Sequence, residues 1–138
     1  MVLEDLIRLI NLQLQMFGYA VTEQDKPAIE YQAEKAAQYV CNFCNFKKCP
    51  DDIPSTLKFV TVDYAIGEFF DYRKTFAPDT LSMLNLDMAV KQIKAGDTDT
   101  TFAVDDGSKT HEQRLDEFIN YLTSHGKTEL MRHRRIKW

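Results

Sequence analysis

The stretch from residue 54 to residue 74 constrains the fold most, because its apolar side chains lie on nearly every side of a predicted helix. Its β-branched residues would also suit a strand, but the length of the run favours a helix. A helix that is apolar all round has to be covered by other elements, so we expect it at the centre of a bundle. The apolar residues are Leu57, Phe59, Val60, Val62, Tyr64, Ala65, Ile66, Phe69 and Phe70.

Two segments before this stretch also have apolar residues three and four positions apart, which predicts two more helices. The first covers residues 2–17 and ends at Gly18. It has a second apolar face, which indicates either a central helix or contact with a neighbouring subunit. The other helix is predicted to begin near Asp25, with Pro27 in its first turn, and to continue to Cys44. The second face of the first helix consists of Leu9, Leu12 and Met16.

A last helix is predicted after residue 109. Thr110 is followed three positions later by Gln113, which is the spacing of a capping box at a helix start. A regular apolar stripe follows, and Gly126 is predicted to end the helix. The stripe consists of Leu115, Phe118, Ile119 and Leu122.

Between residues 90 and 103 the pattern indicates a β-hairpin. Gly96 and Asp97 lie between two short runs, which is typical of a hairpin turn. A two-residue loop would pair Ile93 with a threonine, whereas a four-residue loop pairs it with Phe102, so we expect the longer loop. Two strands are only marginally stable alone, and this ribbon is therefore expected to rest on the helices or on another subunit.

The composition suits one domain with its own core. The chain has 138 residues, of which 44% are hydrophobic. No apolar run approaches the roughly 18 residues of a membrane span, no secretory signal is recognisable, and three cysteines are an odd number, so we expect a soluble intracellular protein without disulfides.

The predicted fold is mainly α, a small bundle of about four helices with one short β-hairpin. The helical domain covers residues 1–126, and residues 127–138 form an extended, basic C-terminal arm.

Charge is distributed unevenly along the chain. The formal net charge is −4, yet residues 127–138 hold five basic residues against one acid, a balance of +4 that leaves −8 for the remainder. A solvated, fraying terminus is one interpretation of this pattern. The other is a docking segment, because apolar residues are interleaved with the charges: Leu130, Met131, Ile136 and Trp138.

Few residues in the sequence indicate catalytic or metal chemistry. Cys41, Cys44 and Cys49 have a metal-like spacing, but a structural zinc site needs four ligands, and the fourth would have to be a distant histidine. Cys41 and Cys44 also lie on an apolar helical stripe, where cysteine behaves as a small hydrophobe, so we expect core packing. The chain has no glycine-rich phosphate loop and no serine elbow. We therefore expect no enzyme, no metal and no cofactor.

Several short motifs, in their order and spacing, resemble the small head–tail connector proteins of tailed bacteriophages, also called adaptor or head-completion proteins. The resemblance covers most of the chain. The motifs are Thr22–Asp25 at a helix start, Cys44-Asn45 followed by Ile53-Pro54, the helix Val60–Phe70, Ile93–Thr98, the helix start Glu112–Leu115 and the closing Arg134–Trp138.

The resemblance implies a structural subunit that assembles into a ring, commonly of twelve copies, beneath the portal of the phage head. Such a ring extends the DNA channel and contacts a tail or stopper protein, and its acidic body suits a wall that passing viral DNA does not bind. The protein would lie at the head–tail interface of the virion, and in the host cytoplasm during assembly. The C-terminal segment would dock on the portal protein, through Arg132, Arg134, Arg135, Ile136, Lys137 and Trp138. The hairpin would contact a neighbouring subunit or the tail, through Ile93, Lys94, Gly96, Asp97 and Phe102.

Two other functions remain open at this point. A small DNA-binding or packaging accessory protein could use the basic C-terminal tail, and its DNA binding would then depend on salt and vanish without residues 130–138. A zinc-stabilised interaction module is the weaker alternative, and metal analysis of the purified protein tests it.

Overall fold

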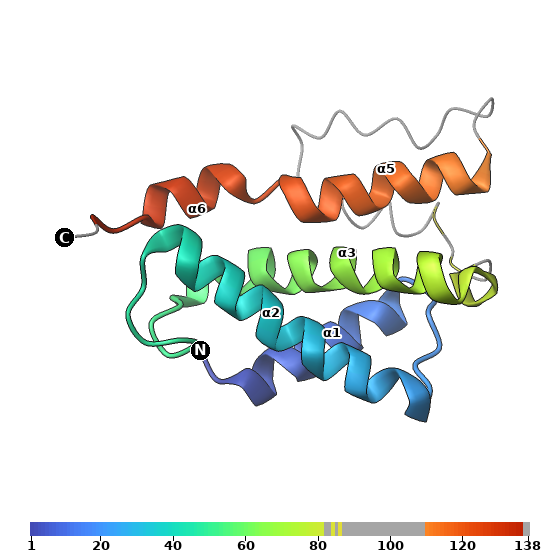
Figure 1. Ribbon diagram of the computed structural model, residues 1–138, viewed down its shortest axis with the longest axis horizontal. Helices are drawn as coiled ribbons and strands as arrows, with labels where there is room; N and C mark the ends of the chain where they lie inside the picture. Colours follow the sequence, from blue (N-terminus) through green and yellow to red (C-terminus); the bar gives the residue numbers. More distant parts are fainter. Residues whose placement is uncertain (82–83, 85, 87–109, 137–138) are drawn as a thin grey trace.

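The computed structural model describes residues 1–81, 84, 86 and 110–136, and this part of the chain is a helical bundle (Figure 1). The mainly α fold class is confirmed, and none of the described residues lies in a β-strand. The predicted hairpin, with Ile93, Lys94, Gly96, Asp97 and Phe102, lies outside the described residues and stays a prediction. The helices are α1 (Leu3–Met16), α2 (Lys26–Cys44), α3 (Lys58–Phe76), α5 (His111–Ser124) and α6 (Lys127–His133), with short 3-10 turns at Glu23–Asp25 (η1), Ser55–Leu57 (η2) and Pro78–Leu81 (η3).

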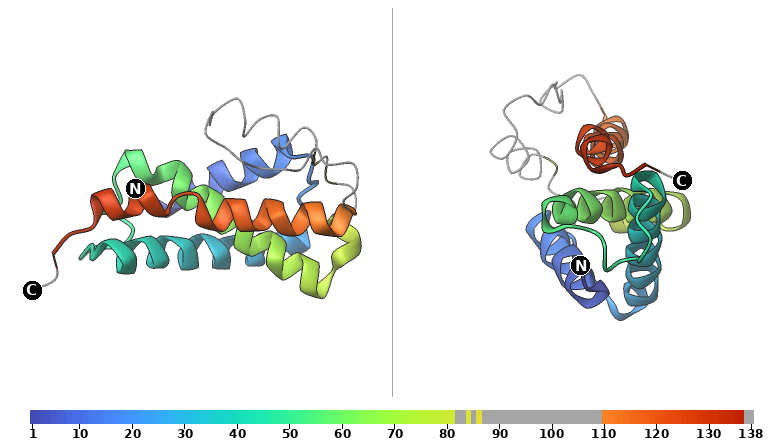
Figure 2. Two further views of the ribbon diagram at one scale, coloured as in Figure 1. Left: turned by 90° about the horizontal axis from the view of Figure 1, so that it is seen from above. Right: turned by 90° about the vertical axis from the view of Figure 1, so that its left-hand side faces the viewer.

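Helix α3 lies in the middle of the bundle, as the apolar stretch predicts. It packs against α1 and α2 on one side and against α5 on the other, so that the helices form three layers (Figures 1 and 2). Phe59, on its first turn, is exposed. The buried residues of α3 are Thr61, Val62, Ala65, Ile66, Gly67, Phe69 and Phe70.

Helix α1 buries one apolar face and exposes the other. The helix ends before Gly18, whose φ of 87° lies in the left-handed region that favours glycine. Phe17 packs edge-on against Phe118 of α5, with 5.1 Å between the ring centroids. Leu12 and Met16, which belong to the second face, are exposed. The buried side is formed by Leu6, Ile10, Leu14 and Phe17.

The start of α2 is tied to α3 by a buried carboxylate. Asp25 is completely buried, and its Oδ2 accepts hydrogen bonds from Tyr19 Oη at 2.9 Å and from the backbone N–H of Thr22 at 3.0 Å. Arg73 of α3 places Nη2 2.9 Å from Asp25 Oδ1. Pro27 occupies the first turn of α2, as predicted. The helix start therefore also fixes how the chain before α2 sits on α3.

Helix α5 begins and packs as the sequence predicts. The backbone N–H of Gln113 donates to Thr110 Oγ1 at 3.2 Å, and the Gln113 side chain accepts from the Thr110 N–H at 3.1 Å. The whole predicted stripe is buried. The helix approaches α3 closely at Gly67, where a Cβ atom would lie only 2.6 Å from Thr123 Cγ2.

The C-terminal region differs from the extended arm predicted for residues 127–138. Residues 127–133 form α6, and Leu130 is buried in the bundle core. A seven-residue helix is not stable by itself, so the burial of Leu130 against α2 decides its conformation. Of the described residues, none belongs to a helix long and apolar enough to span a membrane.

Candidate functional site

The joint between α5 and α6 is held against α3 by one tight contact and one polar pair. Gly126 faces Val60 so closely that a Cβ atom on the glycine would lie 2.3 Å from Val60 Cγ1. Next to it, His125 Nε2 lies 2.8 Å from Asp63 Oδ2. At the far end of α6, His133 Nε2 lies 3.0 Å from the hydroxyl of Thr56. These contacts fix the α5–α6 joint to the N-terminal half of α3, and they fix the end of α6 to Thr56 in η2.

After α6 the chain is clamped to the end of α2 at residue 135. The backbone N–H of Arg135 donates to the carbonyl of Cys44 at 2.8 Å, and Asn45 Nδ2 donates to the carbonyl of Arg135 at 2.7 Å. The last carbonyl groups of a helix have no partner within the helix, and the clamp provides one for Cys44. Asn45 has a φ of 60°, in the left-handed conformation that often ends helices.

The two arginines at the clamp interact with their own domain. The Arg135 guanidinium lies 4.8 Å from the ring centroid of Phe46, and its Nη1 lies 3.2 Å from Asp52 Oδ2. Arg134 lies 5.6 Å from the ring centroid of Phe43. Positive charge near the C-terminus of a helix is also favoured by the helix dipole. In the described chain, these two predicted portal-docking residues thus anchor the segment to α2 and to the loop that follows it.

That loop, residues 45–54, is itself held in place by hydrogen bonds. The backbone N–H of Lys48 donates to Asp52 Oδ2 at 3.1 Å, and the N–H of Asp52 donates to the Lys48 carbonyl at 2.9 Å. The amino group of Met1 donates to the carbonyls of Pro50, Asp51 and Ile53. The Lys48 N–H, with a smaller contribution from Arg135, holds the pKa of Asp52 below its usual value.

The expectation of no disulfide is wrong, because Cys41 and Cys49 form one, with 6.1 Å between their Cα atoms. The loop turns back along α2 and brings Cys49 to the last turn of the helix, which the spacing of the cysteines does not reveal. The predicted core packing is confirmed for both Cys41 and Cys44, which are buried in the core. Cys44 is not in a disulfide and donates its thiol to the Leu130 carbonyl at 3.3 Å. Burial raises the pKa of this thiol. The described residues contain no group of three or more potential metal ligands.

Beyond the clamp, the chain carries an exposed apolar residue. The side chain of Ile136 is 75% exposed. Lys137 and Trp138 follow it, and their positions lie outside the described residues. Arg132, on the exposed side of α6, pairs with Glu129 at 2.8 Å. The structure therefore divides the six predicted docking residues. Arg134 and Arg135 are exposed but contact their own domain, and the last two residues are not described. Arg132 and Ile136 are also exposed.

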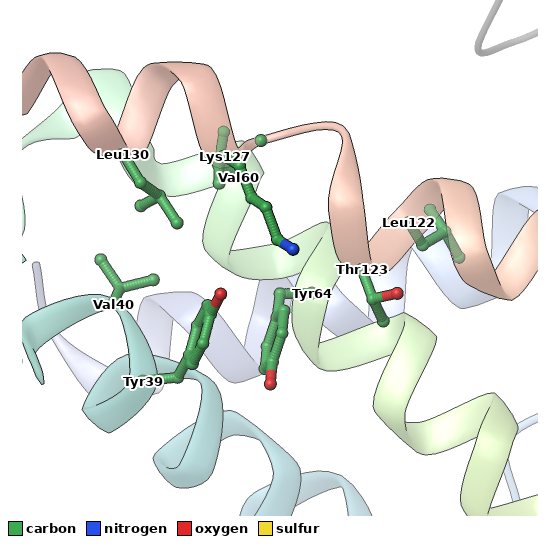
Figure 3. A pocket seen from close by; sticks show the side chains of 9 residues that line it. Tyr39, Val40, Val60, Tyr64, Leu122, Thr123, Lys127 and Leu130 are labelled. Carbon is green, nitrogen blue, oxygen red and sulfur yellow. The ribbon is translucent and has the colours of Figure 1, made fainter. Parts of the chain in front are cut away.

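A small pocket between α2, α3 and the α5–α6 joint was not indicated by the sequence (Figure 3). Its volume of about 10 Å³ is enough for about one water molecule. The rings of Tyr39 and Tyr64 are stacked with 4.2 Å between their centroids, and the Lys127 side chain extends toward them (Figure 3). Burial, with a smaller contribution from Glu68, raises the pKa of Tyr64 to about 12. Only the tertiary arrangement brings these residues together.

No family model, curated protein sequence or solved structure matches this chain.

Changing Asn45 to glycine is expected to release the C-terminal segment without unfolding α2. Glycine adopts the left-handed conformation at least as readily as asparagine, so the helix end is preserved while the hydrogen bond to the Arg135 carbonyl is lost. We expect faster hydrogen exchange of the Arg135 amide and a change in unfolding free energy of less than about 1 kcal/mol. Unchanged exchange at Arg135 in this variant would show that the side-chain bond does not hold the segment.

The Asp52 carboxyl is expected to titrate below pH 3.8, the value for an unperturbed aspartate. Because its folded pKa is lowered, its stabilising contacts are present above pH 3.8 and are lost as the pH falls through the folded value. In the Arg135→Ala variant we expect the midpoint to rise but to stay below 3.8, since the Lys48 N–H is the larger cause. An NMR titration of the carboxyl measures both midpoints, and a wild-type midpoint at or above 3.8 contradicts the prediction.

Proposed function

We propose that the protein is a structural assembly subunit of the head–tail connector type, which forms a ring and binds a portal protein through its C-terminal end. The observation that carries this proposal is the backbone clamp at Arg135. The clamp fixes the point from which the last residues leave the domain, and the first of them, Ile136, is exposed. A short segment that starts from a fixed point loses less conformational entropy on binding than a loose tail.

In this proposal the docking residues have two different roles. Arg134 and Arg135 anchor the segment to Phe43, Phe46 and Asp52 of their own domain. Ile136, Lys137 and Trp138 contact the portal, together with Arg132 on α6. Aromatic and arginine side chains dominate the energy of many interfaces, and a basic segment suits an acidic surface on the partner.

Ring formation is supported by apolar side chains that the described bundle leaves uncovered. Leu12 and Met16 are one turn apart on α1, and both are exposed. Leu9, three residues before Leu12, is partly buried. A neighbouring subunit would cover this face. The hairpin predicted near residues 90–103 would add a second contact with a neighbouring subunit or the tail, because two strands are only marginally stable alone.

The experiment compares the native mass of the purified protein alone and mixed with the portal protein from the same source. We expect a ring in one or both samples, and we expect removal of residues 136–138 to abolish portal binding without changing the ring. The matched control is Lys26→Ala, a charge removal at the start of α2, away from the clamp, which should leave binding intact. A stable monomer that does not bind the portal would overturn the proposal.

A DNA-binding accessory protein is the second candidate, favoured by exposed lysines near the same segment. Lys47 and Lys48 are exposed in the loop that holds Arg135, so the cationic surface extends beyond the C-terminal residues. For this function we expect a gel shift with duplex DNA that weakens steeply with salt and is lost without residues 130–138. Binding that is insensitive to that deletion excludes it.

A further inference from the structure

We propose that the Cys41–Cys49 disulfide is a redox-sensitive latch that determines how tightly the C-terminal segment is held against α2. The disulfide joins the last turn of α2 to the loop of residues 45–54. The same loop provides the contacts that hold Arg135. The release of the segment is therefore coupled to the oxidation state of Cys41 and Cys49.

Three contacts connect the latch to the segment. Asn45 and Phe46 lie between the two cysteines in the chain, and Asp52 lies three residues after the second. Asn45 binds the Arg135 carbonyl, Phe46 lies beneath its guanidinium, and Asp52 pairs with it. A disulfide across this stretch limits the conformations of Asn45 and Phe46 directly, and it fixes the start of the short chain that leads to Asp52. Without it, the loop has more accessible conformations, and the contacts are made for a smaller fraction of the time.

A reductant can approach the disulfide at Cys49 and not at Cys41, because the two residues differ in exposure. Cys49 is exposed, whereas Cys41 is 1% exposed. A thiolate of a dithiol reductant attacks Sγ of Cys49, which breaks the bond to Cys41 and forms a mixed disulfide. The Cys41 thiolate takes up a proton, and the second thiol of the reductant then displaces Cys49, which is also protonated. The reductant loses two electrons and two protons, and the protein gains them as two thiols.

The buried thiol of Cys44 can report whether the C-terminal segment is held against α2. Cys44 donates its thiol to the Leu130 carbonyl, and its own carbonyl accepts the Arg135 N–H, so α6 and the segment after it lie against this residue. When the segment detaches, a reagent reaches the Cys44 sulfur more easily. The coupling between the disulfide and the release of the segment is a property of the protein alone. Only its consequence for portal binding rests on the proposed function.

The first experiment measures how fast Cys44 reacts with a maleimide. Cys44 is the free thiol of the oxidised wild type and also of the variant Cys41→Ala/Cys49→Ser, so the two rates are directly comparable. We expect the variant to react about tenfold faster, in line with the loss of a constraint on a short loop. Equal rates in the two proteins would overturn the proposal.

A second measurement separates local release from general destabilisation, because Cys41 lies in the core. Hydrogen exchange of the Arg135 amide is followed in the wild type with and without dithiothreitol, and in the single variant Cys49→Ser. We expect faster exchange at Arg135 on reduction and in the variant, with buried α3 amides unchanged. Acceleration throughout α3, or no response at Arg135, contradicts a local latch. Portal binding is measured separately, so its failure leaves this result intact.

Discussion

Replacing Asp25 with alanine is expected to lower the free energy of unfolding by about 3–5 kcal/mol, the range for breaking a buried ion pair by removing one partner. The carboxylate is completely buried, accepts hydrogen bonds from Tyr19 and Thr22, and pairs with Arg73. Its removal leaves the Arg73 guanidinium, which is 15% exposed, without its counterion. Urea unfolding followed by circular dichroism measures the effect.

The control is Glu23→Ala, which removes an exposed carboxylate two residues away. Glu23 pairs with Lys26 at 2.9 Å on the surface, and such pairs contribute less than about 1 kcal/mol. Adding Arg73→Met to the Asp25 variant should recover part of the loss, because the unpaired charge is then removed as well. If the Asp25 and Glu23 variants lose the same stability, the buried network is not what holds η1 against α3.

Changing Gly126 to alanine is expected to cost about 1–3 kcal/mol, the usual penalty for overpacking. The backbone at Gly126 has φ −84° and ψ −1°, which alanine can adopt, so the penalty comes from contact rather than from conformation. The added Cβ would lie 2.3 Å from Val60 Cγ1 and within 3.2 Å of two further atoms of that side chain. The joint between α5 and α6 would have to move away from α3.

A second substitution at Val60 is expected to recover part of the stability that Gly126→Ala loses. Val60→Ala removes both γ carbons, including the one at 2.3 Å, and leaves only Cβ at 3.2 Å, so the double variant is expected to lose less stability than the sum of the two single variants. The unfolding free energies of the four proteins give the coupling directly. Additive effects would contradict the close contact. Because α6 is attached through this joint, Gly126→Ala should also speed hydrogen exchange at Arg135, whereas the double variant should restore part of the protection.

Much of the bundle could be predicted from local patterns. The central position of α3 follows from its apolar residues on every side, and the start of α5 follows from the Thr110 and Gln113 capping box. Gly18 ends the first helical stretch as expected. These features depend on neighbours three or four residues apart, so a periodic pattern is sufficient to find them.

The candidate site was only partly predictable. The concentration of positive charge after residue 126 drew attention to the segment that the structure shows held against α2, but not to the different contacts of its arginines. Arg135 anchors the segment because Phe46 and Asp52 lie beside it, about 85 residues earlier in the chain. The disulfide between Cys41 and Cys49 was missed for a related reason, since neither an odd number of cysteines nor a helical stripe with Cys41 and Cys44 shows where the following loop brings Cys49.

The amino-acid sequence alone thus determined that α1, α2, α3 and α5 are helical, that the apolar stripe of α5 is buried and where positive charge accumulates, because propensity, periodicity and charge are properties of local sequence. It did not determine that residues 127–133 form a helix. The fold determined the buried Asp25–Arg73 pair, the contact of Gly126 with Val60, and the clamp of Arg135 on α2. Each of these joins residues far apart in the chain. Their distances depend on how the helices pack together, and no local pattern encodes that packing.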